Sequence, residues 1–171
     1  MTTLISTRDM IAADRQTTGD IIEHDTCKIH LCYIKEFDEY AYVAFCGSVY
    51  VQKLTLKQFS ERDYDERLSM AENSVAGLVL TESGLLLEFN HMLQFYQTQY
   101  EFAANGSGIQ YATAAFECTH DIIRSIKVAA RHDNNTNSEV DYFLIEDIDV
   151  YIDELKSKEI LFMNLKHRRN D

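Results

Sequence analysis

Short runs of apolar and β-branched residues, separated by tight polar turns, follow one another from residue 2 to residue 89. Runs of this kind are typical of β-strands, and a short polar turn between two of them predicts a hairpin. In the last of these turns, Gly84 can supply the positive φ that a tight reversal requires. The expected hairpins pair residues 2–7 with 10–13, 27–34 with 40–45, and 74–80 with 85–89.

Apolar residues at helical spacing occur between the second and third of these hairpins and again after the third. Residues 49–59 predict one helix, and a second is expected to begin at Ile109, directly after a Gly-Ser-Gly sequence. A third helix is expected after Thr119 as its N-cap, and residues 140–145 predict a further strand. This order of strands, helix, strands, helix pair and strand predicts an α+β fold with helix-covered sheets, not an alternating βαβ fold.

The chain has 171 residues, 46% of them hydrophobic and 26% charged, which is typical of one globular domain spanning residues 1–171. Lys and Arg number 16 against 28 Asp and Glu, so the formal net charge is −12. Such a charge repels phosphate backbones and anionic lipids, so we expect neither nucleic-acid nor membrane binding. No apolar stretch approaches the ~20 residues that span a bilayer.

The first residues, Met1-Thr2-Thr3-Leu4, lack the basic and apolar regions of a secretory signal. A cytoplasmic location is therefore expected. In that reducing compartment the four cysteines should remain free thiols.

Thr2 is the first residue that points to specific chemistry. Removal of Met1 before so small a residue would leave Thr2 with a free α-amine, whose pKa of ~7.7–8.0 lets it accept the hydroxyl proton near neutral pH. Most chains that begin Met-Thr carry only an ordinary processed terminus. Further residues must therefore support a catalytic interpretation.

Asp14 and Lys28 are those further residues. The opening hairpin places Asp14 opposite or diagonal to Thr2. Lys28 interrupts a strand-like run, where an inward-pointing ammonium would need a partner such as Asp14. A cation beside Thr2 would lower the pKa of its hydroxyl. The alternative is an ordinary surface ion pair, which is the commoner meaning of such a pattern.

Six short segments together resemble a known family. In order and approximate spacing they are similar to proteasome β-subunits and to their bacterial relative, the heat-shock-locus V (HslV) peptidase. The last two segments resemble the family's Gly-Ser-Gly loop and its Asp-x-x-Ser motif. The segments are residues 2–6, 12–19, 27–29, 44–48, 105–108 and 133–136.

The resemblance covers residues 2 to about 147 and implies a four-layer αββα sandwich of the N-terminal nucleophile (Ntn) hydrolase type. Residues 49–73 are too short for the family's paired helices, so one helix of the first helical layer is expected to be shortened or missing. In the family this helix pair faces a neighbouring ring or an ATPase unfoldase. The shortened layer therefore argues against docking of a conventional ATPase unfoldase.

The resemblance also implies the roles of individual residues. Thr2 would be the nucleophile and Asp14 and Lys28 would tune it. Backbone N–H groups near Ala44 and Phe45 would bind the oxyanion, which needs preorganised donors. The residues expected to hold the terminal amine and a catalytic water are Ser107, Asp133 and Thr136.

Substrate and ion contacts follow from the same resemblance. Thr17 and Thr18 would pair with an extended substrate strand. An apolar or aromatic specificity pocket would be lined by His30, Tyr42, Cys46 and Tyr50, beside Ala44 and Phe45. No cofactor is required, but an optional Na⁺ or other hard cation would be bound by the backbone carbonyls of Ala130, Asp133 and Thr136.

The leading hypothesis is a threonine endopeptidase that cleaves unfolded proteins through an acyl-enzyme on Thr2, inside a homo-oligomeric ring or stacked rings. Two alternatives stay open. One is a catalytically silent scaffold or assembly protein with the same fold, including one of viral origin. The other is an Ntn amidohydrolase that acts on a small amide.

Overall fold

The computed structural model describes residues 2–16, 27–61 and 75–165. Its strands form two antiparallel sheets, one of four strands in the order β8-β1-β2-β9 and one of six in the order β10-β3-β4-β5-β6-β7. The elements are β1 (Thr3–Thr7), β2 (Met10–Asp14), β3 (Ile29–Ile34), β4 (Glu39–Cys46), α1 (Val49–Glu61), β5 (Ala76–Thr81), β6 (Leu86–Phe89), β7 (Phe95–Gln97), β8 (Phe102–Gly106), α3 (Ile109–Thr119), α4 (Ile122–Ala129), β9 (Val140–Leu144), η1 (Ile145–Asp147), α5 (Ile148–Ser157) and β10 (Phe162–Asn164).

The two sheets face one another across a shared apolar core, because successive side chains of a strand point to opposite faces. Leu4 of β1 and Tyr42 of β4 belong to this core between the sheets. Their neighbours Ile5 and Val43 belong instead to two separate outer clusters. Each sheet therefore buries both of its faces.

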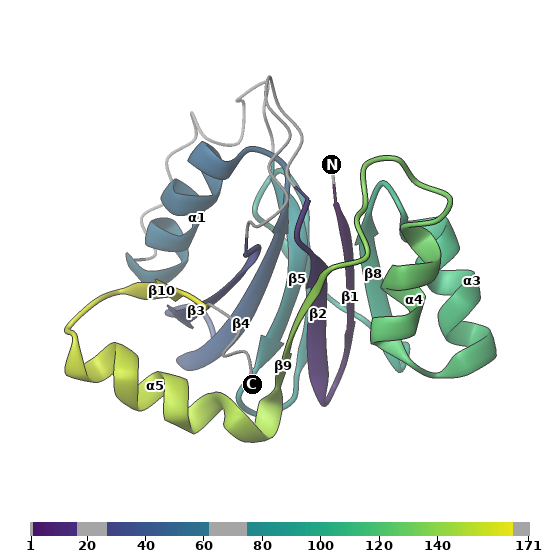
Figure 1. The fold of residues 1–171 in the computed structure, drawn as a ribbon. Helices are drawn as coiled ribbons and strands as arrows, with labels where there is room; N and C mark the ends of the chain where they lie inside the picture. The colour runs from purple at the N-terminus through teal and green to yellow at the C-terminus, as the bar shows by residue number, and fades with distance from the viewer. Residues whose placement is uncertain (1, 17–26, 62–74, 166–171) are drawn as a thin grey trace.

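Helices cover the outer faces of the sheets (Figure 1). α3 and α4 pack on the four-stranded sheet, with Phe116 and Ile126 in the cluster that they share with β1. α1 packs on the six-stranded sheet through Leu56 and Phe59. α5 inserts Ile152 into the core between the sheets. No helix among residues 2–16, 27–61 and 75–165 is long and apolar enough to cross a bilayer.

The three predicted hairpins and the three predicted helices are confirmed, with boundaries that shift by a few residues. Gly84 has a φ of 79°, as the third turn requires. The α+β class and the absence of alternating βαβ units follow from the two antiparallel sheets. The expectation of a shortened helical layer falls partly on residues 62–74, which lie outside the described residues.

One helix N-cap was predicted at the wrong residue, and several elements were not predicted. Thr119 is not a helix N-cap but the last residue of α3; Asp121 caps α4, because its carboxylate accepts a hydrogen bond from Arg124 N at 2.9 Å. The sequence also did not reveal β7, β8, α5 and β10. β7 and β10 have three residues each, too few for a recognisable alternation.

Candidate functional site

Thr2 directly precedes β1, and only 4% of its surface is exposed. The register of β1 with β8 pairs Thr3 with Gly106, so the loop after β8 closes over Thr2. Ser107 N donates a hydrogen bond to the Thr2 carbonyl oxygen at 2.8 Å. Gly106 has a φ of 101°, and a Cβ atom there would lie 1.9 Å from that same oxygen. Only glycine therefore allows this contact.

Asp14, at the end of β2, is fully buried and accepts four hydrogen bonds. Its Oδ1 accepts from Thr3 N at 2.7 Å and from the Lys28 ammonium at 2.9 Å. Its Oδ2 accepts from Gln16 N at 3.0 Å and from Asn137 N at 3.4 Å. Thr3 N is the nitrogen of the peptide bond between Thr2 and Thr3. The carboxylate thus lies one peptide unit from Thr2 and is saturated with donors.

Lys28 precedes β3, and its side chain is 4% exposed. Burial lowers the pKa of Lys28 below its ordinary value, and the charge and hydrogen bond of Asp14 offset only part of this effect. A lowered pKa reduces the cost of losing a proton. Lys28 is thus an ammonium of reduced basicity held against the Asp14 carboxylate.

Three further predicted residues form a hydrogen-bonded cluster next to Thr2. The hydroxyls of Ser107 and Thr136 donate to Asp133 Oδ2 at 2.6 and 2.7 Å. Because Thr136 uses its proton in this way, the Thr3 hydroxyl must donate to Thr136 Oγ1, 2.6 Å away. Ser107 Oγ also lies 3.4 Å from the Thr2 carbonyl oxygen.

Asp133 is the acceptor at the centre of this cluster. Burial alone would raise its pKa, but hydrogen bonds from Ser107, Thr136 and Asn135 outweigh burial and hold the pKa below its ordinary value. Asp133 is thus a carboxylate at neutral pH, and both hydroxyls are oriented toward it. Gly108 lets the cluster form, because a Cβ atom there would lie 2.1 Å from Thr3 Oγ1.

The expected oxyanion donors are corrected by the structure. Phe45 N donates to the Lys28 carbonyl at 3.1 Å, so this N–H group is already used within the sheet. Ala44 is fully buried and paired with both Ile29 and Leu78, so its backbone also lies inside the ladder. Buried ladder groups of a central strand cannot turn toward a substrate.

Gly47 belongs to the segment 44–48, but no separate role was expected for it. It follows the last residue of β4, is exposed and has a φ of 112°. The preceding Cys46 is half-buried, with Sγ 3.2 Å from Asn105 Oδ1 on β8. This contact places the end of β4 beside the loop that binds Thr2. The available signal was the glycine itself, which often marks the point where a strand opens.

The expected pocket residues do not lie together. Tyr42 lies in the core between the sheets, where its hydroxyl donates to the Leu144 carbonyl at 3.2 Å; its assignment to a pocket was wrong. His30 lies on the opposite face of the six-stranded sheet, edge-on to Phe45. Tyr50 belongs to α1, but its side chain is outside what the structure describes. Thr17 and Thr18 also lie outside the described residues.

The carbonyls expected to bind a cation belong to the turn that follows α4. Ala130 caps that helix, and the Asp133 carbonyl already accepts from Thr136 N at 3.1 Å. Among the described residues, the side chains form no group of three or more His, Cys, Asp and Glu suited to a metal ion. The carbonyl site stays a prediction.

Comparisons of the sequence with family models and with curated proteins find no match. Solved structures do match. HslV from Trypanosoma brucei is 19% identical, with a TM-score of 0.62, over 83% of this chain and 98% of that one. BPH from Thiobacillus denitrificans is 17% identical, with a TM-score of 0.61, over 84% and 96% of the two chains.

A third structure, the Anbu (Gly-1) mutant from Hyphomicrobium sp. strain MC1, is 12% identical, with a TM-score of 0.60, over 93% of this chain and 97% of that one. All three are proteasome-β-like N-terminal nucleophile hydrolases. The resemblance seen in the sequence is therefore confirmed at the level of the fold.

Proposed function

We propose that this chain is an N-terminal-threonine peptidase that hydrolyses peptide bonds of unfolded proteins. The observation that carries the proposal is a single carboxylate oxygen, Asp14 Oδ1, which binds both Thr3 N and the Lys28 ammonium. A buried ion pair is costly to maintain. Its position one peptide unit from a buried terminal threonine supports a chemical role for it.

The reaction would begin after removal of Met1. Thr2 Oγ1 attacks the substrate carbonyl carbon while the α-amine of Thr2 accepts the hydroxyl proton. Lys28 favours the developing alkoxide by its positive charge. The amine of the cleaved bond then departs with a proton from the α-ammonium, leaving an ester on Thr2. Water hydrolyses the ester and restores the hydroxyl.

Two groups would support these steps. The Ser107, Asp133 and Thr136 cluster would hold the terminal amine and the hydrolytic water, since Asp133 is ionised and the cluster contacts both Thr2 and Thr3. The oxyanion would bind the backbone at Gly47, where β4 leaves the sheet, in place of Ala44 and Phe45.

The wider properties of the protein are part of the same proposal. We infer one domain over residues 1–171, with its helices and sheets stacked as an αββα sandwich. The copies would assemble into a homo-oligomeric ring or stacked rings in the cytoplasm, which would restrict access to unfolded chains. An optional hard cation at residues 130–136 would not take part in bond cleavage.

The test has two parts. Intact mass of the purified chain should show loss of Met1, and a peptide library should be cleaved. Thr2→Ala should abolish cleavage, whereas Thr7→Ala, a control at the other end of the same strand, should leave it unchanged. Epoxomicin, which is present in a solved structure of BPH with a TM-score of 0.54 to this chain, should inhibit the wild type.

The alternatives predict different outcomes. Retained Met1, or cleavage unaffected by Thr2→Ala, would contradict the proposal. A scaffold would cleave neither peptides nor small amides. A small-amide hydrolase would leave the peptide library intact but turn over members of an amide panel in a Thr2-dependent way.

A further inference from the structure

Residues 89–100 contain no Asp, Glu, Lys or Arg, although 26% of the whole chain is charged. This segment includes the end of β6, a turn, β7 and the connection toward β8. Its composition is dominated by Tyr, Phe, Gln and Asn. In a chain of net charge −12, a charge-free surface segment is conspicuous and requires a physical reason.

β7 is the terminal strand of the six-stranded sheet and pairs with β6 on one side. Among the described residues, its other side has no strand partner. Soluble proteins usually protect such an edge by keeping the strand very short, or with Lys, Pro or a bulge. Here β7 reads Phe95-Tyr96-Gln97, and the chain contains no proline. This edge therefore has none of the usual charged or proline protection.

The turn before β7 is held in one conformation by Asn90. Its side-chain oxygen accepts from Met92 N at 2.9 Å and from Gln94 N at 3.3 Å. Its amide nitrogen donates to the Tyr96 hydroxyl at 2.9 Å, and that hydroxyl donates to Gln94 Oε1 at 2.7 Å. The Tyr96 ring is thus fixed in position, which lowers the entropy lost when a partner binds.

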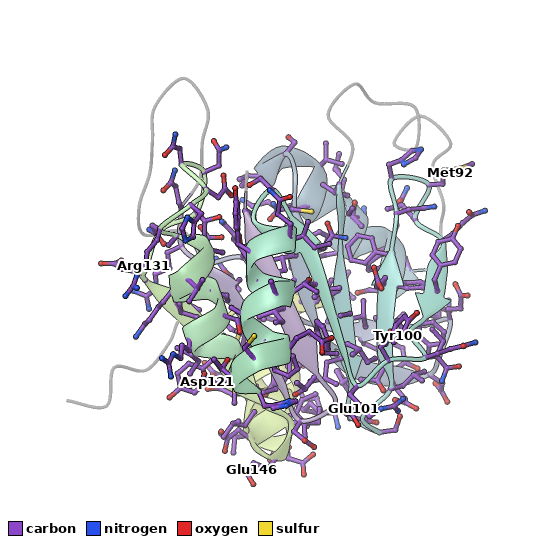
Figure 2. All side chains as sticks on the ribbon, turned by 90° about the vertical axis from the view of Figure 1, so that its right-hand side faces the viewer. Met92, Tyr100, Glu101, Asp121, Arg131 and Glu146 are labelled. Atoms are coloured by element: carbon purple, nitrogen blue, oxygen red, sulfur yellow. The ribbon has the colours of Figure 1, made fainter. Side chains whose placement is uncertain are left out.

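Large apolar side chains project from this preorganised edge. Met92, Tyr96 and Tyr100 are 54%, 50% and 77% exposed. Figure 2 shows Met92 and Tyr100 on one side of the molecule, opposite the side where Arg131 projects. A shallow hollow of about 530 Å³ lies at Met92 and Tyr96, and its wall also includes Phe95 and Glu36. Tyr and Met are enriched in protein interfaces, from which charged residues are depleted.

We propose that the β7 edge, defined as Met92, Tyr96 and Tyr100 with the open side of β7, binds the same edge of a second copy of this chain. Two copies of net charge −12 repel one another, so their contact is favoured where neither contributes a charge. A partner that binds through charged side chains would find no Asp, Glu, Lys or Arg in residues 89–100 to pair with. Two identical strand edges pair antiparallel about a two-fold axis, which joins the two six-stranded sheets.

This contact is independent of the proposed catalysis, because β7 contributes no residue to the site around Thr2. It differs also from a head-to-tail ring contact, since a two-fold interface uses the same surface on both copies. The wild-type assembly should therefore contain an even number of copies, whatever other contacts it makes.

The test is the mass of the full-length protein in solution, measured by light scattering and sedimentation over a range of concentrations. Tyr100→Lys and the double variant Tyr96→Lys/Tyr100→Lys should halve the mass, or weaken the association at least tenfold, because each pair of copies then brings like charges together. Val150→Lys is the matched control, since Val150 is 57% exposed on α5, outside the β7 edge. It should leave the mass unchanged.

Circular dichroism melting of each variant shows whether it has folded. Tyr100→Lys keeps the test decisive if the double variant unfolds, because the ring of Tyr100 is largely in solvent. A wild type with an odd number of copies, a monomer included, would overturn the proposal. So would an unchanged mass in folded Tyr100→Lys, or an equal loss of mass in Val150→Lys.

Discussion

Asp14 and Lys28 form a buried ion pair, with 2.9 Å between Asp14 Oδ1 and Lys28 Nζ, that joins the two sheets. Asp14 ends β2 of the four-stranded sheet, and Lys28 leads into β3 of the six-stranded sheet. Asp14 also binds backbone next to the proposed nucleophile, through Thr3 N, whereas the Lys28 carbonyl binds Phe45 N within the six-stranded sheet. The pair therefore serves the packing of the sheets and the site together.

Removing one partner should be strongly destabilising. Lys28→Met leaves the Asp14 carboxylate buried without its counter-ion, and such losses cost roughly 3–5 kcal/mol. Urea unfolding would measure the change in free energy. The matched control is Lys57→Met, which removes an exposed pair with Glu61 3.8 Å away and should cost less than about 1 kcal/mol. Equal losses of unfolding free energy in the two variants would show that the buried pair stabilises the fold no more than the exposed pair does.

Gly106→Ala should disrupt the packing of the loop after β8 against Thr2, at the N-terminal end of β1. The new methyl group would lie 1.9 Å from the Thr2 carbonyl oxygen, and the φ of 101° is unfavourable for alanine. Gly84→Ala is the control, because its φ is 79° but the nearest atom to a new methyl group is Arg8 O at 3.7 Å. We expect about 1–2 kcal/mol from backbone strain at Gly84 and a clearly larger loss at Gly106. Thermal melting compares them, and a smaller effect at Gly106 would contradict the close contact.

Stability should depend on pH through His30. Burial lowers the pKa of His30 from 6.5 to about 4, because it outweighs the opposing effect of the nearby Gln52 side chain. Between these values the unfolded chain binds a proton that the folded chain does not, so stability falls as the pH falls from 6.5 to 4. The full difference is roughly 3 kcal/mol.

His30→Leu should remove this component, while His91→Leu, at an exposed position, serves as the control for other titrating groups. Urea unfolding of the three proteins at several pH values between 4 and 7 provides the comparison. If His30→Leu shows the same loss of stability toward low pH as the wild type, His30 is not buried in its neutral form.

Local patterns were enough to predict much of the framework. The hairpins and helices followed from the spacing of apolar residues, which repeat every two residues in a strand and about every three and a half in a helix. Such repeats depend only on residues that are close together in the chain. The residues at Thr2, Asp14, Lys28, Ser107, Asp133 and Thr136 could be chosen as a set because their chemical types and order match a known constellation. The structure places the last five of these around Thr2 and Thr3.

Sequence patterns could not show which backbone groups remain free, nor which way a strand faces. Tyr42 was expected in a pocket but faces the core, and Phe45 was expected to bind an oxyanion but donates to Lys28. Both errors have one cause. Strand register decides these outcomes, and a shift of a single residue reverses the face of every side chain.

By itself, the order of residues determined the α+β class, the hairpins, the helices and the chemical groups available to the site. Only the packed sheets decided that Gly106 must carry no side chain, that Gly47 marks the open end of β4, and that the uncharged β7 lies at an edge. Spacing along a chain reports on neighbours a few residues apart. Contacts between residues 2 and 106, or 14 and 28, form only when strands that are distant in sequence pair and pack together in the folded protein.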